Sequence, residues 1–571
     1  MIKGIAASNG IGIGKAFILK TKVDNSLYTG KKISASDVEN ELRRFKEAVE
    51  ETDKHYDLVI EKAKGVLNDS EQQVFHAYKM MLKDPIFSDM VTGAIKNDSF
   101  CVEWAVISSA EQLKQMFLQL NDDYMKQRAE DVSNISKSLL LSLTGNTATD
   151  LSEILEDSII IAEDLSPADT VSMNKQYVKG FAVEKGGETS HTAIMARTME
   201  IPALVGCEKK IFDIKNGDLL IVDGEKGILI VNPTPDELDE YLDKQQEYLK
   251  AIEKIKLLKD EPSVTLDGKN VHLVGNIANP EEAIEILAKG GDGIGLFRTE
   301  FLYLNRVDLP TEEDQFLAYK MVADAMGIRP CIIRTLDIGG DKKSALLNLP
   351  NEDNPFLGYR AIRICLKEKE IFKTQLRAIL RASTFGNLKI MFPMISSLEE
   401  LIAAKQILKE AMSELDERKI PYNEDIQVGI MIEVPSAAIA ADILAQEADF
   451  FSIGTNDLCQ YTLAVDRMNE HVSSLYNPLN IGVLRLIKMI IDAGHAHGIQ
   501  VGMCGEMASN PKYTRLLLGL GLDEFSMVPA SIPYVKQAVR EINYNNAVDV
   551  AKTALSFNET EKIRKHLKEE A

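Results

Sequence analysis

One histidine stands where it could carry a phosphoryl group. It lies in the stretch GGETSHTAIMAR, Gly186 to Arg197, where two glycines allow a tight turn and Thr189 and Ser190 can cap a helix. His191 then falls on the first turn of that helix, where unsatisfied N–H groups and the helix dipole favour an anion. The stretch therefore predicts a phosphorylated histidine, unless His191 merely follows a capping pair in a glycine turn.

Two carboxylates end consecutive apolar runs further along the chain. Glu433 ends VGIMIE, and Asp457 ends SIGTND. Hydrated Mg²⁺ suits one or two carboxylates whose shell is completed by water and substrate oxygens, and Mn²⁺ accepts the same oxygen ligands. The pair therefore predicts a site for such a cation. A general acid–base pair, or ion pairs with nearby arginines, are the alternative uses.

Four arginines belong to the same half of the chain. Arg298 and Arg334 lie at the ends of apolar runs, Arg360 follows in NPFLGYRAIR, and Arg467 follows in QYTLAVDR. A guanidinium binds a carboxylate or a phosphate with a bidentate fork, so several of them together predict a small, multiply anionic substrate. The alternative is that nearby acids neutralise the arginines, and the candidates are Glu300, Asp337 and Asp341. This alternative explains one or two arginines more easily than four.

One cysteine adds a possible proton donor. Cys504 lies in QVGMCGEMA, at the end of another apolar run and beside a glycine. A thiol with a pKa near about 8.5 is mostly protonated at neutral pH and could protonate a carbanion or an enolate. Taken alone, a cysteine in this position is more often a buried apolar side chain.

These residues need a scaffold that brings strand ends together. Eight apolar runs after Asp260 alternate with helical stretches, which predicts a closed (β/α)₈ barrel over 261–571. The runs are VHLVGNI, GIGLFRT, CIIRTLD, LKIMFPM, VGIMIEV, FFSIGTN, QVGMCGE and DEFSM. A barrel places its chemistry at the carboxyl ends of its strands, where this chain has Asn276, Arg298, Glu300, Arg334, Asp337, Glu433, Asn456, Asp457 and Cys504.

The first half of the chain has a different pattern. Short strands over 1–22 and 146–230 predict an α/β domain that carries His191, and the long helical periodicity between them predicts an inserted bundle over 23–145. The bundle is either a structural insert or a docking surface for a protein. A charged helix over 231–260 then links this part to the barrel. The predicted fold class is therefore a multidomain α/β protein.

Composition limits the partners. With 571 residues the chain should hold two or three domains, and no apolar run approaches a membrane span. A formal charge of −22 repels nucleic acid and anionic lipid but would attract a basic protein. The six cysteines are scattered without zinc spacing, which suits a reducing cytoplasm.

The ordered set of motifs resembles a known family. GGETSHTAIMAR, FRTEFLY, RTLDIGGDK, NPFLGYRAIR, IMIEVPSA, SIGTNDLCQYTLAVDR and GMCGEMA are similar to enzyme I of the bacterial phosphoenolpyruvate-dependent sugar phosphotransferase system. The resemblance extends from GIAASNGIGIGKAF to DEFSMVP, essentially the whole chain. It implies that phosphoenolpyruvate phosphorylates His191, which passes the group to a histidine of the phosphocarrier protein HPr.

The resemblance also assigns roles by motif. His191 would be the nucleophile and Thr170, in LSPADT, would bond its ring, while Cys504 would protonate the enolate to pyruvate. The residues implied to hold substrate are Arg298, Arg334, Arg360, Arg467 and, against the phosphate, Asn456, with Asp457 beside them. Glu433 and Asp457 would hold Mg²⁺. The family further implies that the bundle docks HPr and that the barrel forms a homodimer.

The bundle departs from the family's usual pattern. Where a glutamate and then a histidine commonly follow a phenylalanine, this chain has Phe75, His76, Ala77 and Tyr78. The neighbouring candidates for contact with HPr are Glu71, Phe75, Tyr78 and Met80. A second departure is Asn305, which stands where an aspartate is usual and where we expect little effect on chemistry.

Two other functions remain as alternatives. Pyruvate phosphate dikinase and phosphoenolpyruvate synthase are similar in their phosphohistidine and barrel domains, but residues 1–150 here have no glycine-rich phosphate loop. A partner-binding regulator without catalysis is the alternative from another class. The presence of His191, Glu433, Asp457 and Cys504 together argues against that regulator.

Overall fold

The fold is known from a computed structural model. It describes residues 1–19, 25–63, 69–119, 123–144, 151, 154–187, 190–303, 306, 308–340, 347, 349–350, 352–469 and 471–569. The chain divides into two compact units, Met1–Ala251 and Ile252–Ala571, and each is described by itself.

The first unit is built on an eight-stranded sheet with the order β1-β8-β7-β3-β4-β5-β6-β2. Its strands are β1 (Ile2–Lys3), β2 (Ile5–Ser8), β3 (Ile11–Ile18), β4 (Ser158–Ala162), β5 (Val178–Val183), β6 (Ala203–Val205), β7 (Leu219–Asp223) and β8 (Ile228–Val231). Successive side chains of a strand point to opposite faces. Accordingly, Ile160 of β4 joins one core cluster, while Ile159 and Ile161 join the cluster on the other face.

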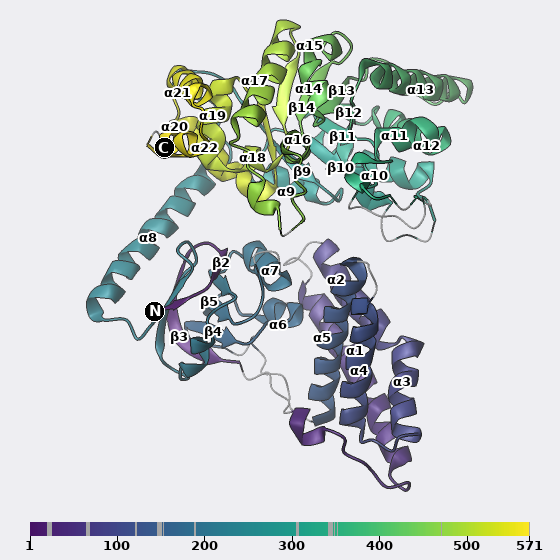
Figure 1. Ribbon diagram of the computed structural model, residues 1–571, viewed down its shortest axis with the longest axis vertical. Coiled ribbons are helices and arrows are strands. Elements are labelled where there is room, and N and C mark those ends of the chain that lie inside the picture. The colour runs from purple at the N-terminus through teal and green to yellow at the C-terminus, as the bar shows by residue number, and fades with distance from the viewer. Residues whose placement is uncertain are drawn as a thin grey trace. The chain divides into compact units, whose positions relative to one another are not determined.

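A helical bundle is inserted between β3 and β4, as the sequence predicts (Figure 1). It consists of the short η1 (Asn25–Tyr28) and of α1 (Val38–Ala63), α2 (Asp69–Leu82), α3 (Pro85–Lys96), α4 (Val102–Gln119) and α5 (Asp123–Thr144). Its apolar core continues to Val171 of α6 (Pro167–Ser172) and Met195 of α7 (His191–Met199). The bundle therefore packs against the helix that begins at His191.

The charged helix expected after the sheet is α8 (Pro235–Leu257), which follows β8. The short η3 (Lys209–Asp213) lies earlier, between β6 and β7. Thr234 and Glu237 cap its start by exchanging hydrogen bonds between side chain and backbone N–H. Tyr241 donates its hydroxyl to Asp223 at 3.2 Å, which fixes the first turns to the sheet. The boundary between the two units, after Ala251, falls inside this helix.

The second unit is a closed barrel in which all eight strands pair in parallel. They are β9 (His272–Ile277), β10 (Ile294–Arg298), β11 (Cys331–Arg334), β12 (Leu388–Phe392), β13 (Val428–Ile432), β14 (Phe450–Ile453), β15 (Gln500–Met503) and β16 (Glu524–Met527). All eight strands predicted from the sequence are confirmed. A cluster of side chains from the neighbouring strands β10 to β14 and from the residue after β15 fills the interior: Leu296, Ile332, Met391, Met431, Phe450 and Cys504.

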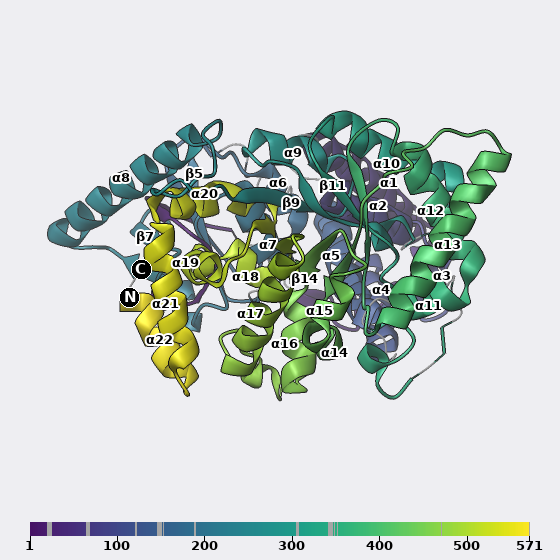
Figure 2. The same cartoon turned by 90° about the horizontal axis from the view of Figure 1, so that it is seen from above.

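Helices surround these strands, as Figure 2 shows for α10, α12, α13 and α17. They are α9 (Glu282–Ala288), α10 (Glu312–Met326), α11 (Ile362–Lys367), α12 (Lys369–Ala382), α13 (Leu398–Glu417), α14 (Pro435–Ile439), α15 (Ala441–Leu444), α16 (Thr455–Leu463), α17 (Ile481–Ala496), α18 (Glu506–Ser509), α19 (Pro511–Leu520), α20 (Ile532–Glu541), α21 (Tyr544–Ser556) and α22 (Thr560–Glu569). Short 3₁₀ turns are η4 (Thr299–Leu302), η6 (Pro355–Leu357), η7 (Ser473–Leu475) and η8 (Pro529–Ser531).

Two properties of the described residues bear on location. None of their helices has the length and the apolar content that crossing a bilayer requires. All six cysteines are buried free thiols: Cys101, Cys207, Cys331, Cys365, Cys459 and Cys504.

Candidate active site

The predicted helix start at His191 is confirmed. Gly186 adopts a φ of 96°, and the Ser190 hydroxyl caps the helix by accepting a hydrogen bond from the Ala193 N–H at 3.3 Å. His191 is the first residue of α7, so it lies at the positive end of the helix dipole. The side chain of His191 and the whole of Thr189 lie outside the described residues.

Thr170 lies nearby on α6, fully buried. Its hydroxyl donates to the Ser166 carbonyl at 3.0 Å, which leaves the oxygen's lone pairs able to accept from a ring N–H. Thr192 Oγ1 of α7 donates to the Leu165 carbonyl, two residues before α6, at 2.9 Å. The bond between Thr170 and the ring of His191 remains a prediction.

Arg334 is one of two arginines neutralised within the barrel mouth. It ends β11, where its Nη2 donates to Glu300 Oε1 at 2.7 Å and its Nη1 lies 3.1 Å from Asp337 Oδ2. All three side chains are buried. A buried guanidinium between two carboxylates is held in one orientation, because each charge requires its partner.

Arg360 is the second neutralised arginine and connects two acids. Its Nη2 donates to Asp337 Oδ1 at 3.0 Å and to Asp457 Oδ2 at 3.2 Å. Its Nη1 donates to the Tyr461 hydroxyl at 3.1 Å. Asp337 therefore bridges Arg334 and Arg360, and Arg360 links this pair to Asp457.

Arg298 and Arg467 keep hydrogen-bonding capacity. Arg298 ends β10 and is half-buried, and no hydrogen bond or ion pair joins its guanidinium to another described residue. Arg467 Nη2 lies 3.8 Å from Asp457 Oδ1, and its buried Nη1 has no hydrogen-bond partner among the described residues. Arg334 and Arg360 are thus neutralised by close ion pairs and Arg467 forms a longer one with Asp457, while Arg298 and Arg467 retain N–H groups that can bind an anion.

The two predicted carboxylates differ in environment. Glu433 directly follows β13, is 2% exposed and accepts the Met394 N–H on Oε1 at 2.7 Å. Burial, together with the negative charges of Asp457 and Asp337, raises the pKa of Glu433 well above its ordinary value, although Arg360 and Arg334 oppose the shift. Asp457 lies in the first turn of α16 rather than on a strand.

These carboxylates fit a divalent cation. Asp457 Oδ1 is buried and has no hydrogen-bond partner among the described residues. A cation beside it would supply the positive charge that a buried ionised Glu433 lacks. The described part of the chain has no group of three or more His, Cys, Asp or Glu side chains placed to bind a metal. Two carboxylates completed by water and substrate oxygens match the coordination of Mg²⁺.

Cys504 directly follows β15 and faces the barrel interior. Burial raises the pKa of its thiol to about 11, so the sulfur is protonated at neutral pH.

Asn456 is not joined to the arginine cluster by any hydrogen bond within the described residues. Instead its amide exchanges hydrogen bonds with Glu506, at 3.2 Å from Nδ2 to Oε1 and 3.2 Å from the Glu506 N–H to Oδ1.

Sequence reasoning missed two residues of this site. Tyr461 accepts from Arg360 and donates to the Phe356 carbonyl, and it lies in the motif SIGTNDLCQYTLAVDR without having been singled out. Gln375 is fully buried on α12 and bonds the Leu336 N–H at 2.9 Å and Thr299 Oγ1 at 3.0 Å. The signal for Gln375 was its position on the apolar face of that helix, beside Leu376.

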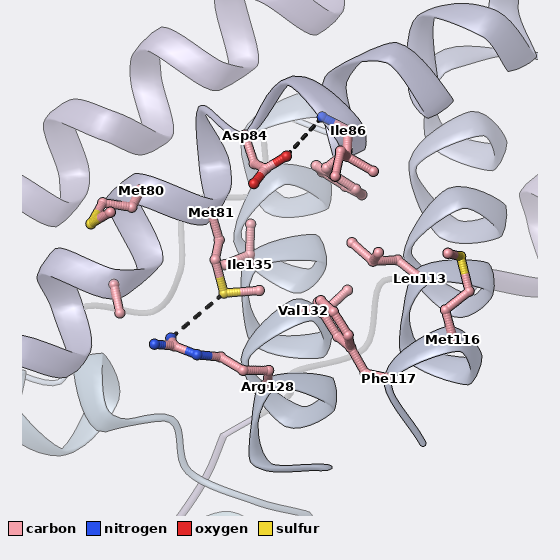
Figure 3. A pocket seen from close by; sticks show the side chains of 12 residues that line it. Met80, Met81, Asp84, Ile86, Leu113, Met116, Phe117, Arg128, Val132 and Ile135 are labelled. Atoms are coloured by element: carbon pink, nitrogen blue, oxygen red, sulfur yellow. Dashed lines mark hydrogen bonds between the residues drawn. The ribbon is translucent and has the colours of Figure 1, made fainter. Parts of the chain in front are cut away.

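The bundle has a separate pocket of about 440 Å³. Figure 3 shows it between α2, α3, α4 and α5. It is lined by Ala77, Met80, Met81, Asp84, Ile86, Phe87, Leu113, Met116, Phe117, Arg128, Val132 and Ile135. Arg128 Nη1 lies 3.8 Å from the Met81 sulfur, and Asp84 accepts the Ile86 N–H at 2.7 Å.

The burial of two candidate contact residues corrects part of the docking prediction. Phe75 is 0% exposed and Tyr78 is 1% exposed, because both pack into the bundle core, so neither can contact a partner. Met80 is 76% exposed and stays available. The side chains of Glu71 and His76 lie outside the described residues, as does Asn305.

Known proteins match this chain over its whole length. Sequence profiles of PEP-utilising enzymes match it in three parts: the N-terminal domain at 3–128, the mobile domain at 154–227 and the PEP-binding domain at 252–544. A phosphoenolpyruvate-protein phosphotransferase of Priestia megaterium is 46% identical over 99% of this chain and 98% of its own. The protein of that name from Bacillus subtilis (strain 168) is 45% identical over 100% and 99%.

A solved structure is similar to part of the chain. The NMR solution structure of an Enzyme I protein (nEIt) is 39% identical to this chain, covers 43% of it and 99% of its own length, and has a TM-score of 0.39. The profiles and the full-length relatives confirm the resemblance seen in the motifs. The chain therefore belongs to the phosphoenolpyruvate-protein phosphotransferase family, enzyme I, of the PEP-utilising enzymes.

Proposed function

We propose that phosphoenolpyruvate binds at the barrel mouth and phosphorylates His191, and that phospho-His191 then phosphorylates a histidine of HPr. This would be the first step of sugar uptake by the phosphotransferase system. The single observation that carries the proposal is the buried cluster at the mouth, in which Arg298 and Arg467 keep free capacity beside Glu433 and Asp457. Such a cluster suits a small substrate that carries both a carboxylate and a phosphate.

The arginines divide the work of binding. Arg334 and Arg360 are already held by Glu300, Asp337 and Asp457, so their positive charges are fixed before substrate arrives. Arg298 and Arg467 supply new charge-assisted hydrogen bonds, each worth roughly 1.5–3 kcal/mol. Asn456, whose second amide hydrogen is not used by Glu506, would contact the phosphate.

Glu433 and Asp457 would hold Mg²⁺, or Mn²⁺, which accepts the same oxygen ligands. When bound, the cation neutralises charge that develops on the phosphoryl and enolate oxygens. The side chains of the barrel mouth carry out the rest of the work, which is to bind and orient the substrate. Phosphoryl transfer depends on positioning and charge neutralisation more than on covalent chemistry by the protein, and the ion-paired arginines provide both.

The bonds change in two stages. The bond between phosphorus and the enol oxygen breaks as a bond to an imidazole nitrogen of His191 forms, which leaves the enolate of pyruvate. The thiol of Cys504 then gives its proton to the methylene carbon, and pyruvate results. The thiolate regains a proton from solvent, which its pKa of about 11 favours.

His191 is placed to keep the phosphoryl group. The N–H groups at the start of α7 and the helix dipole stabilise a negative charge on the first turn. Thr170 would orient the ring by accepting its other N–H. Since the group must be received from one site and delivered to another, His191 has to travel between the barrel mouth and HPr.

Domain roles follow from this route. We assign 1–22 and 146–230 to the phosphohistidine domain, 23–145 to HPr docking, 231–260 to the hinge and 261–571 to phosphoenolpyruvate binding and homodimerisation. Several of these boundaries fall on residues outside the described part of the chain. The buried free thiols fit a reducing cytoplasm.

The pocket of the bundle is the proposed docking surface for HPr. Exposed Met80, Ile86 and Met116 surround an apolar floor, and methionines adapt their shape to a partner. Arg128 and Asp84 add one charge of each sign at its rim. The negative charge of the whole chain would speed the approach of a basic partner.

The first experiment is incubation with labelled phosphoenolpyruvate and Mg²⁺ without nucleotide. We expect an acid-labile, base-stable label that maps to His191 and moves onto added HPr. Label that stays on His191 would contradict the docking role of the bundle. The absence of label, with correctly folded protein and Mg²⁺ present, would overturn the proposed function as a whole.

A further inference from the structure

We infer that Asn276 is a positioning residue that fixes the peptide of Cys504 and thereby directs its thiol at the enolate. The inference deepens the proposed function and rests on it. Asn276 is the penultimate residue of β9, 9% exposed, and the sequence places it at a strand end without giving it a role.

The amide of Asn276 bonds two neighbouring strand ends. Its Nδ2 donates to the Cys504 carbonyl at 3.2 Å and to the Ser526 carbonyl at 3.4 Å, and its Oδ1 accepts the Ser526 hydroxyl at 2.5 Å. Both N–H groups and the carbonyl of the amide are therefore engaged. With its amide engaged, Asn276 has no donor left for substrate, so it acts through Cys504.

Cys504 depends on this bond because the strand ladder ends before it. The pairing of β15 with β16 stops at Met503 and Phe525. The Cys504 N–H still donates to the Ile453 carbonyl at 3.1 Å, but its carbonyl points toward Asn276 instead of a ladder partner. Asn276 thus replaces the missing strand contact on that side of the peptide.

The next residue completes the constraint. A Cβ atom placed on Gly505 would lie 1.6 Å from Thr455 Oγ1, so the chain after Cys504 runs tightly against the start of α16. The peptide around Cys504 is thereby held on three sides, by β14, by Asn276 and by α16. The sulfur lies 3.8 Å from the Ile453 carbonyl and interacts with the Ser452 side chain, both on β14, so the held backbone and this strand together set where the thiol points.

Proton transfer makes this orientation important. A general acid must lie within hydrogen-bond reach of its acceptor and contributes about 10²–10⁴-fold to the rate. A displacement of about 1 Å can cost about 10²-fold. Loss of the Asn276 bonds should therefore slow the proton transfer more than it weakens substrate binding.

Asn276→Asp tests the inference at nearly constant volume. A carboxylate cannot donate to either carbonyl and repels both, so the Cys504 peptide loses its anchor. Asn387→Asp is the control for the chemical change itself, because Asn387, which is exposed, also donates to a carbonyl, that of Ile328 at 3.2 Å, just before β12 at the opposite end of the barrel. Cys504→Ala serves as the reference for a lost proton donor.

Two measurements separate positioning from a general effect on stability. The first is kcat for pyruvate formation against KM for phosphoenolpyruvate. The second is exchange of the methyl hydrogens of pyruvate in heavy water with Mg²⁺, which reports the proton step without phosphoryl transfer. For Asn276→Asp we expect both rates to fall about 10- to 100-fold while KM stays within about threefold. Asn387→Asp and phosphorylation of His191 by phospho-HPr should not change.

The outcomes are distinguishable. Exchange at the wild-type rate in Asn276→Asp, together with slow exchange in Cys504→Ala, would overturn the positioning role and leave the proposed function intact. Wild-type exchange in Cys504→Ala would remove Cys504 as proton donor, and the inference with it. If Asn276→Asp does not fold, Ser526→Ala removes the hydroxyl that orients the amide, and a wild-type exchange rate there would also overturn the inference.

Discussion

Arg360 donates a hydrogen bond from Nη2 to Asp457 Oδ2 at 3.2 Å, which joins a residue proposed to hold substrate to one proposed to hold the cation. The other oxygen of Asp457 is buried and has no hydrogen-bond partner among the described residues. We propose that this carboxylate serves two functions, with one oxygen for the guanidinium and the other for the metal. Changing it should affect the barrel reaction alone.

Asp457→Asn should abolish phosphorylation of His191 by phosphoenolpyruvate, because an amide cannot replace the charge that the cation and Arg360 both require. We expect a loss of at least about 10²-fold, since metal stabilisation of the transition state is worth several kcal/mol. Reverse transfer from phospho-HPr to His191 should continue. Labelled phosphate followed in both directions measures the two reactions, and loss of both would contradict separate sites.

Met80→Asp should weaken transfer to HPr, because it puts a charge at the edge of the apolar pocket on α2. If Met80 is one of the few contacts that dominate binding, its loss costs about 2 kcal/mol, and the second-order rate constant should fall about 30-fold. Leu58→Asp is the control, since Leu58 on α1 is also largely exposed, at 65% against 76% for Met80, but does not line the pocket. Equal effects of the two changes would argue against this docking surface. Phosphorylation by phosphoenolpyruvate should be normal in both.

Glu524→Gln should stabilise the barrel at high pH. Glu524 begins β16 and is buried, and burial raises its pKa to about 7, although Lys389 opposes the shift. Because the folded protein holds this proton more tightly than the unfolded chain, ionisation costs stability as the pH rises from about 4.5 to about 7. The glutamine has no proton to lose.

The thermal midpoint of barrel unfolding, measured from pH 5 to pH 8 for both proteins, tests this prediction. We expect the midpoint of the variant to exceed that of the wild type increasingly as the pH rises. The corresponding difference in the free energy of unfolding should reach about 3 kcal/mol above pH 7, from about 1.36 kcal/mol for each pKa unit. Parallel pH profiles would show that Glu524 ionises in the fold without cost.

Gln375→Leu should raise KM for phosphoenolpyruvate, because Gln375 bonds the Leu336 N–H and Thr299 Oγ1 in the two loops that follow β11 and β10. Each buried group left without a partner also costs about 1–3 kcal/mol of stability. Gln315→Leu provides the comparison: Gln315 is also buried and bonds Tyr319 and, further along the segment after β10, Tyr303 and the Pro310 carbonyl, but it bonds neither Leu336 nor Thr299. Unfolding midpoints should fall in both variants, whereas a rise of KM confined to Gln375→Leu is the expected sign of positioning. A normal KM in Gln375→Leu would contradict it.

The barrel could be predicted from the sequence because its strands are buried on both faces. Runs such as VGIMI and FFSI are continuous and apolar, and a parallel sheet covered by helices requires this pattern. The positions of Glu433 and Cys504 directly after strands followed from the same pattern. Asp457 was placed correctly near a strand end, although the helix α16 begins two residues before it.

Pairing of side chains could not be predicted in the same way. Arg334 and Asp337 are only three residues apart, but the ion pairs of Arg334 with Glu300 and of Arg360 with Asp457 join the ends of different strands, so no local spacing reveals them. The same holds for Phe75 and Tyr78, whose burial depends on packing against the other helices of the bundle. An aromatic residue on a helix predicts a contact but not whether its partner lies inside the chain or outside it.

The inserted bundle also governs the order of folding. β3 and β4 are parallel neighbours from Lys15↔Ser158 to Ile18↔Ile161, yet residues 19–157 separate them. Closing so long a loop in an unfolded chain costs entropy, and contacts between distant residues form slowly. A bundle that folds first shortens this loop. During synthesis on the ribosome we therefore expect α1–α5 to be structured before β3 pairs with β4.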